Sequence, residues 1–191
     1  MTPDNHLGGC DGGAGTWLPD IWERMIVLYQ IRSVIDIGCG MARNTKWFLD
    51  HGCEVLGVEG FPEYVKLAQI PIENMLCHDY TRGPYVPSGH YDLGWCSEFV
   101  EHVEERFASN FLATFTRCRH VCLTYATPGQ GGYHHVNENT LEYWVAKMDS
   151  VGFTHDADYT RAMRATGPDI GYGRRTLTWF DNRNMDDIGA L

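Results

Sequence analysis

Residues 33–60 read SVIDIGCGMARNTKWFLDHGCEVLGVEG, and the order of elements in this stretch decides the fold class. A short β-branched run ends at Asp36 and a pair of glycines, and residues 41–52 then carry apolar side chains at helical spacing before a glycine stop. Residues 54–60 form a second run that is nearly all apolar, as is typical of parallel strands covered on both faces. The stretch therefore predicts a strand, a helix and a second, parallel strand.

The same alternation continues on both sides of this unit. It predicts helices over residues 19–29, 63–69, 99–116 and 140–153, and strands over residues 74–79, 91–96 and 120–126. Two further strand-like runs, over residues 154–159 and 175–180, suit an antiparallel pair. We therefore expect an α/β fold with a mostly parallel seven-stranded sheet, an antiparallel terminal strand and helices on both faces.

The length of 191 residues and the hydrophobic content of 43% suit one domain with one substantial core. We expect a glycine-rich arm or lid over residues 1–18, a core over residues 19–180 and a tail over residues 181–191. The sequence does not decide between a monomer and a homodimer.

The formal net charge of -10 argues against an extended nucleic-acid surface, which needs clustered Lys and Arg. The chain shows neither a signal-peptide pattern nor an apolar run of membrane-spanning length. Its seven cysteines are an odd number and do not follow disulfide-framework spacing. We expect a cytoplasmic protein with reduced thiols and with neither nucleic acid nor membrane as a partner.

Acidic side chains end three successive predicted strands. Gly38 and Gly40 allow the backbone to approach a ligand closely after the first strand, and Glu59 ends the second strand, where a carboxylate can hold both hydroxyls of a ribose. Asp79, followed by Tyr80, ends the third strand, where an acceptor and a ring can meet an adenine. Arg43 replaces the third glycine of a dinucleotide-binding turn, so the pattern favours an adenosine without a pyrophosphate.

From about Ser33 to Phe180, these motifs resemble the class I S-adenosylmethionine-dependent methyltransferases, which have a Rossmann-like fold. The runs GGAGTW, HVCLTYATPGQGGYHHVN and EYW are similar to a bacterial and phage-like branch of these enzymes. The resemblance implies that S-adenosylmethionine is the cofactor and S-adenosylhomocysteine its product. It further implies that the turn DIGCG holds the methionine part, Glu59 the ribose and Asp79 the adenine. The cofactor-binding residues expected on this basis are Asp36, Gly38, Cys39, Gly40, Glu59, Gly60, Asp79, Tyr80, Cys96 and Trp17.

The fourth strand leads to the reacting end of the expected site. Glu98 and His102 are four residues apart on the predicted helix and would share a face, and Glu101 would also lie near Glu98. The remaining acids of the run EHVEE are expected to face solvent. Helix capping is the alternative role for Glu98 and His102.

A glycine-rich loop with two histidines follows the fifth strand and would overhang the same edge. Histidine can transfer protons near neutral pH, and we expect only one of the adjacent His134 and His135 to face the site. His135 is the preferred candidate, with anchoring of the loop as the alternative role, and Gln130 and Tyr133 are weaker candidates. The expected catalytic residues are thus Glu98, His102 and His135.

Two further features leave alternatives open. Trp17 would either close over the sulfonium of the cofactor or pack onto the following helix. Cys118, His120 and Cys122 alternate along a predicted strand, but they lack the spacing of zinc ligands, so core thiols are expected and no metal is assigned.

The sequence thus predicts a methyltransferase that acts on a small or medium polar acceptor, such as a sugar, a glycan precursor or a metabolite. Oxygen is the favoured acceptor atom, because a carboxylate and histidines gather at the expected site. Two alternatives remain, a non-catalytic protein that binds S-adenosylmethionine and an NAD-dependent oxidoreductase.

Overall fold

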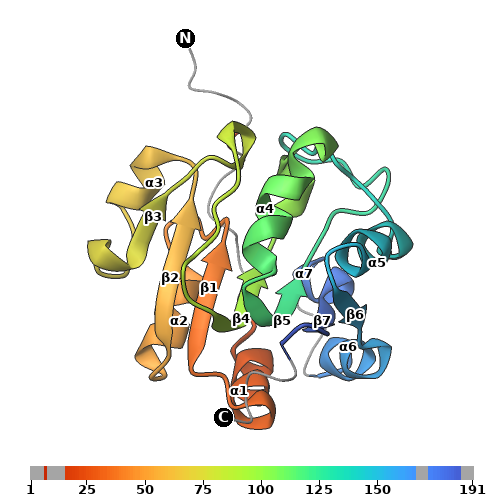
Figure 1. Ribbon diagram of the computed structural model, residues 1–191, viewed down its shortest axis with the longest axis horizontal. Helices are drawn as coiled ribbons and strands as arrows, with labels where there is room; N and C mark the ends of the chain where they lie inside the picture. The colour runs from red at the N-terminus through yellow and green to blue at the C-terminus, as the bar shows by residue number, and fades with distance from the viewer. Residues whose placement is uncertain (1–6, 8–15, 167–171, 186–191) are drawn as a thin grey trace.

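The computed structural model describes residue 7, residues 16–166 and residues 172–185. A single seven-stranded sheet with the order β3-β2-β1-β4-β5-β7-β6 organises this part of the chain (Figure 1). The first five strands are β1 (Ser33–Ile37), β2 (Glu54–Glu59), β3 (Met75–Cys77), β4 (Tyr91–Cys96) and β5 (Cys118–Leu123). They pair in parallel, whereas β7 (Thr178–Asn182) runs antiparallel to both β5 and β6 (Phe153–His155). The mostly parallel α/β fold expected from the sequence is confirmed, and its antiparallel strand lies inside the sheet.

Helices cover both faces of this sheet, and two apolar clusters fill the space beneath them. One cluster buries side chains of α1 (Pro19–Tyr29), α2 (Arg43–Asp50) and α6 (Ala157–Arg164). The other buries side chains of α4 (Ala108–Phe115) and α5 (Leu141–Asp149), and Figure 1 shows α4 in front of the strands. The short helices are α3 (Pro62–Lys66), α7 (Tyr172–Thr176) and the 3-10 turns η3 (Ile72–Asn74), η4 (Tyr80–Arg82), η5 (Val100–His102) and η6 (Glu105–Phe107). None of the described helices has the length and apolar character of a membrane-spanning helix.

The prediction of one helix over residues 99–116 is wrong. The chain instead forms η5 and η6 and begins α4 only at Ala108. Two features interrupt a helix here, because Glu98 has a φ of 53° and Val103 is extended. In addition, the backbone carbonyl of Glu101 accepts hydrogen bonds from the N–H groups of Val136 and Asn137. This carbonyl thus holds the loop that follows β5.

The strand expected over residues 154–159 is also shorter than predicted. β6 ends at His155, and the carboxylate of Asp156 then accepts a hydrogen bond from the backbone N–H of Tyr159, 2.8 Å away. This side-chain cap begins α6, since it satisfies one of the free N–H groups of the first helical turn. The last expected strand, over residues 175–180, is shifted and forms β7, after α7.

Most of the predicted N-terminal arm, residues 1–6 and 8–15, lies outside the described residues, as do residues 186–191 of the expected tail. All six cysteines of the described chain are free thiols.

Candidate functional site

The turn between β1 and α2 requires its glycines. Gly38 has a φ of 74° and Gly40 a φ of 55°, both in the left-handed region that favours glycine. A Cβ atom on Gly38 would also collide with the ring of Phe99. A Cβ on Gly40, in contrast, would meet no atom within 4 Å, so the backbone of this residue borders open space. The turn is therefore a surface that a ligand can approach, and Phe99 connects it to the segment after β4.

Glu59 ties this turn to the end of β2. Its carboxylate accepts hydrogen bonds from the backbone N–H of Gly40 at 2.9 Å and of Phe61 at 2.8 Å. The side chain is buried, and burial raises the pKa of its carboxyl group. The backbone N–H of Gly60 also donates to this carboxylate, so the chain uses three of its four acceptor positions and leaves one for a ligand. Glu59 can therefore hold a hydroxyl of a ribose beside the turn.

Asp36 lies beneath the same turn rather than at its surface. It is 2% exposed, and the hydroxyl of Thr45 donates a hydrogen bond of 2.6 Å to its carboxylate. Burial raises the pKa of Asp36 to about 7, in spite of this hydrogen bond, and the nearby charge of Glu59 adds to the increase. Asp36 therefore supports the turn from below.

Asp79 and Tyr80, at the end of β3, have different environments. The carboxylate of Asp79 accepts hydrogen bonds from the backbone N–H and the hydroxyl of Thr81, both at 2.8 Å. Tyr80 is 3% exposed, its hydroxyl pairs with that of Thr114, and its ring packs edge-on against Phe99. This placement favours a packing role for Tyr80 and leaves Asp79 as the polar group at this strand end.

Cys39 and Cys96 place their thiols in apolar surroundings. The sulfur of Cys39 lies against Gly57 of β2, and Cys96 is fully buried at the end of β4. Burial raises the pKa of both thiols well above the ordinary value. Cys96 is therefore closed to a ligand, whereas Cys39 is partly exposed.

Gly60 and Trp17 have different neighbours. A Cβ on Gly60 would contact the side chain of Leu7. The indole of Trp17 packs edge-on against Trp22 of α1, and the guanidinium of Arg43 lies 4.6 Å from its ring centroid. The sequence allowed two roles for Trp17, and in the structure this side chain packs onto α1.

The segment after β4 brings four ionisable side chains together. The expectation that Glu98 and His102 share a helix face is wrong, because this segment is not one helix. Four side chains nevertheless gather where β4 and β5 end, those of Glu98, Glu101, His102 and His135. The hydroxyl of Thr124 donates a hydrogen bond of 2.7 Å to Glu98 and accepts one of the same length from its backbone N–H. Burial raises the pKa of Glu98.

Glu101 is the most buried acid of this group. It is 0% exposed, and neither of its carboxylate oxygens has a hydrogen-bond partner of good geometry within the described residues. Burial, followed by the neighbouring charge of Glu98, raises the pKa of Glu101 well above its ordinary value. The sequence placed Glu101 near Glu98, but it gave no signal that this acid is completely enclosed.

The imidazoles of His102 and His135 meet edge to face, with ring centroids 5.0 Å apart. Burial lowers the pKa of His102 to about 4, and the charge of His135 contributes, so His102 is neutral at pH 7. Nδ1 of His135 lies 3.4 Å from Oε1 of Glu138, a partner that sequence reasoning missed. His135 is thus the loop histidine that joins this cluster, in agreement with the preferred candidate.

The other loop candidates do not join this group, although the backbone of His134 and of Tyr133 hydrogen-bonds His102. His134 has a φ of 51°, and its Nε2 is buried without a hydrogen-bond partner within the described chain. The amide oxygen of Gln130 accepts a hydrogen bond of 3.1 Å from the backbone N–H of Thr127 and so closes the loop on itself. Tyr133 is 60% exposed. None of the three belongs to the group formed by Glu101, His102 and His135.

Cys118, His120 and Cys122 do not form a metal site. Cys118 and Cys122 lie in different apolar clusters, and Nδ1 of His120 pairs with the carboxylate of Asp181 at 2.7 Å. The two thiols are core residues, as expected.

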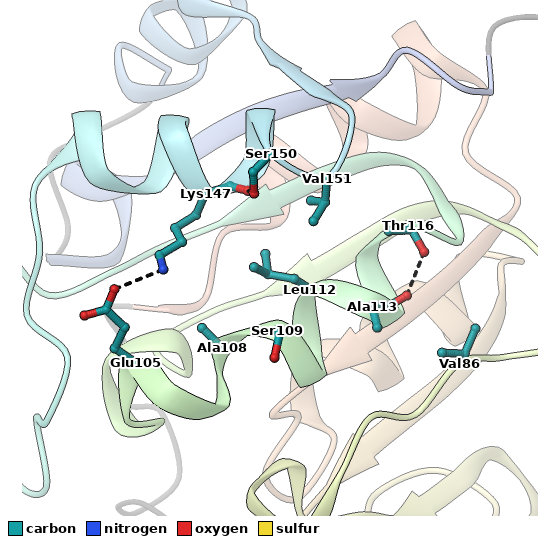
Figure 2. Close-up of a pocket in the computed structure, with 10 residues that line it drawn as sticks. All are labelled: Val86, Glu105, Ala108, Ser109, Leu112, Ala113, Thr116, Lys147, Ser150 and Val151. Atoms are coloured by element: carbon teal, nitrogen blue, oxygen red, sulfur yellow. Dashed lines mark hydrogen bonds and ion pairs between the residues drawn. The ribbon is translucent and has the colours of Figure 1, made fainter.

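A separate hollow of about 460 Å³ lies between α4 and α5, away from the strand ends (Figure 2). Figure 2 shows Lys147 of α5 and Glu105 of η6 at its rim, where they form an ion pair of 3.0 Å. None of the residues expected in the cofactor or catalytic site lines this hollow.

The arrangement at the glycine turn fits S-adenosylmethionine. Gly38 and Gly40 add no side chain to the turn, and Glu59 keeps one acceptor position free for the ribose. Asp79 supplies a carboxylate at the next strand end. Ligands of such sheets bind at the carboxyl ends of the strands, where these groups lie.

Comparisons with known proteins agree with this geometry. Residues 35–121 match the family model described as a methyltransferase domain, and no curated protein matches the chain. The crystal structure of a magnesium protoporphyrin IX methyltransferase from Synechocystis PCC 6803 with bound SAH has a TM-score of 0.62 at 15% identity, and the match covers 86% of this chain and 80% of that chain.

Two other solved structures are similar over nearly their whole length. A glycopeptide N-methyltransferase complexed with S-adenosylmethionine has a TM-score of 0.63 at 14% identity, with 95% of this chain and 97% of that chain covered. A sugar N-methyltransferase from Streptoalloteichus sp ATCC 53650 has the same TM-score at 13% identity, with 92% and 97% covered. Of the three functional hypotheses, these comparisons support the methyltransferase. The match over residues 35–121 places a methyltransferase domain in this chain, and the shared fold supports S-adenosylmethionine as its cofactor.

Proposed function

We propose that the enzyme transfers a methyl group to an oxygen atom of a small or medium polar acceptor, such as a sugar, a glycan precursor or a metabolite. The observation that carries this proposal is the partly buried group of Glu98, Glu101, His102 and His135 next to the glycine turn, in which Glu101 is fully buried. Phe99 links the two, because its ring packs against Gly38 while its neighbour Glu98 belongs to the group.

At the cofactor end of the site, the chain binds S-adenosylmethionine and orients it. In this proposal the backbone of residues 38–40 supports the methionine part, Glu59 accepts a hydrogen bond from the ribose and Asp79 one from the adenine amine. When bound, S-adenosylmethionine supplies an electrophilic methyl group on a sulfonium sulfur, and S-adenosylhomocysteine remains after transfer. Alignment of the acceptor with this methyl group is the main requirement on the protein.

The partly buried group supports oxygen as the acceptor atom. A hydroxyl retains its proton at neutral pH, so its methylation needs a group that withdraws that proton. Glu98 is such a group, since burial raises the pKa of its carboxyl and makes the carboxylate a stronger base. The polar lining also suits a polar acceptor. The glycopeptide and sugar N-methyltransferases support the acceptor class by analogy of fold, whereas their acceptor atom is nitrogen.

The test is transfer of a labelled methyl group from S-adenosylmethionine to a panel of polar acceptors that includes matched pairs of hydroxyl and amino sugars. The proposal expects label on the hydroxyl members and SAH formed in equal amount. Label on the amino members alone would overturn the choice of oxygen. Binding of the cofactor without label on any acceptor would favour the non-catalytic alternative.

We further propose that all 191 residues act as one methyltransferase domain, with residues 1–18 as arm or lid, residues 19–180 as core and residues 181–191 as tail. The sheet supports this, because its strands extend from residue 33 to residue 182.

Cytoplasmic location is proposed from the free thiols of the described chain. Light scattering of the purified protein, with and without SAH, distinguishes a monomer from a homodimer.

A further inference from the structure

Three side chains with metal-binding atoms face one another beyond the end of β4. One ligand atom each from Glu101, His102 and His135 lies within 4.8 Å of the other two. At metal–ligand distances of about 2.0–2.2 Å, neighbouring ligand atoms in a tetrahedral or octahedral site are about 3–3.5 Å apart. Side-chain rotations that shift these atoms by roughly 1 Å therefore bring them to one ion.

The buried acid of this cluster lacks the cationic partner that a buried carboxylate usually has. Within the described residues, no Lys or Arg pairs with the fully buried carboxyl group of Glu101, and its side-chain partner is the carboxyl group of Glu98. Buried charges in folded proteins are paired or bind metal ions, so this arrangement points to an ion that is part of the site. Glu98 lies beside Glu101 and adds a second carboxylate, so the cluster attracts a cation.

The neighbouring residues hold the cluster in the arrangement that a metal site needs. Nδ1 of His135 faces the carboxylate of Glu138, a pairing that orients metal-binding imidazoles in proteins. The backbone carbonyl of Glu101 binds the N–H groups of Val136 and Asn137, so the loop that carries His135 is fastened to the turn that carries Glu101. Residues more than 30 positions apart are thus brought together by hydrogen bonds that do not involve the ligand atoms.

The donor set indicates the kind of ion. Mg²⁺ and Ca²⁺ prefer oxygen ligands, whereas imidazole suits divalent transition metals such as Zn²⁺ and Mn²⁺. Two imidazoles and one carboxylate are also the ligand set of catalytic metal sites, which keep a position open for a substrate oxygen.

We propose that Glu101, His102 and His135 bind a divalent transition-metal ion and that this ion receives the acceptor's hydroxyl oxygen. The acceptor class is thereby narrowed to molecules whose hydroxyl can reach a metal ion. An ion at this position lowers the pKa of the hydroxyl, whose proton passes to the carboxylate of Glu98. The oxygen then bonds to the methyl carbon as the bond between that carbon and sulfur breaks. The role of the ion rests on the proposed function, whereas the binding of the ion does not.

The test is calorimetric titration of the full chain, freed of metal by a chelator, with Zn²⁺ or Mn²⁺ alone and with Mg²⁺ for comparison. We expect one transition-metal ion per chain, and at least tenfold weaker binding in His102→Ala and in His135→Ala. His90→Ala is the matched control, since His90 is exposed and lies before the start of β4, whereas the cluster lies beyond its end, and it should bind the ion as the native chain does. Glu101→Gln keeps the shape of the side chain but removes its charge, and it should also weaken binding.

SAH titration of each variant separates loss of the site from loss of the fold, because SAH binds at the glycine turn. Absence of transition-metal binding, or equal binding by the native chain and the cluster variants, would overturn the site. Metal binding with methyl transfer that is unaffected by chelator would overturn the role of the ion. Metal binding that the cluster variants lose, without transfer to any hydroxyl, would support the site and refute the proposed oxygen chemistry.

Discussion

Replacement of Glu59 by alanine should weaken the binding of SAH at least tenfold. A hydrogen bond to a charged group contributes about 1.5 to 3 kcal/mol, and about 1.4 kcal/mol corresponds to a factor of ten in affinity. Loss of a single ribose hydroxyl contact is therefore enough to produce this effect. The variant also removes the acceptor of the Gly40 and Phe61 N–H groups, so the turn itself becomes less ordered.

Asp92 provides the matched control for this experiment. Its carboxylate accepts hydrogen bonds from the backbone N–H of Arg32 at 2.8 Å and of Ser33 at 3.0 Å, just as Glu59 accepts such bonds from the turn. Asp92 lies at the start of β4, however, which is the opposite edge of the sheet. Asp92→Ala should therefore lower the melting temperature and leave the affinity for SAH unchanged.

The measurement is calorimetric titration of the native protein and both variants with SAH, beside NAD. The native protein should bind SAH and not NAD. Native affinity in Glu59→Ala would refute the ribose contact and leave Glu59 as a cap of the turn. Equal loss of affinity in Asp92→Ala would show that general destabilisation, rather than the lost contact, causes the effect.

Three further predictions concern turnover, pH and packing. Glu98→Gln and His135→Ala should each reduce methyl transfer more than SAH affinity, and normal turnover in both, once an acceptor is known, would show that the catalytic assignment is wrong. Burial raises the pKa of Asp36 from 3.8 to about 7 in the folded protein, so between these values the folded chain holds a proton that the unfolded chain has released. The free energy of unfolding should therefore fall as the pH rises from about 4 to about 7, and Asp36→Asn should flatten this dependence in thermal melts; an equally steep profile in the variant would contradict it. Trp22→Ala should lower the free energy of unfolding by about 3–5 kcal/mol in urea titrations, because Trp22 is 0% exposed. Val27 is 75% exposed on the same helix, so Val27→Ala should change the free energy of unfolding by less than about 0.5 kcal/mol. Similar effects of the two substitutions would refute the packing argument.

Local sequence patterns were most informative where each segment is decided by its own residues. The run from Ser33 to Gly60 predicted the β1–α2–β2 unit, because apolar strand positions and glycine stops need no distant partner to be recognised. The polar groups at the ends of β1, β2 and β3 followed from the same rule, since parallel strands must end at a common edge.

Tertiary contacts decided the segment after β4. The spacing of its apolar residues suits a helix from residue 99, but the turn at Glu98 and the hydrogen bonds from Val136 and Asn137 to the carbonyl of Glu101 interrupt it. For the same reason, Glu98 and His102 come together through an irregular turn and not through a shared helix face. A local pattern contains no information about a loop more than 30 residues away.

Burial was likewise a property of the folded chain alone. The acids Asp36, Glu59 and Glu101 look alike in the sequence. In the structure, Asp36 supports the turn from below, Glu59 binds backbone N–H groups of the turn, and Glu101 is enclosed beside two imidazoles. The sequence by itself determined the fold class, indicated the cofactor and pointed to the edge of the sheet at which we propose the chemistry, because periodicity and strand-end chemistry are local. Only the tertiary structure decided that Glu101, His102 and His135 lie together, because pKa values and metal-binding geometry depend on which side chains the packing brings into contact.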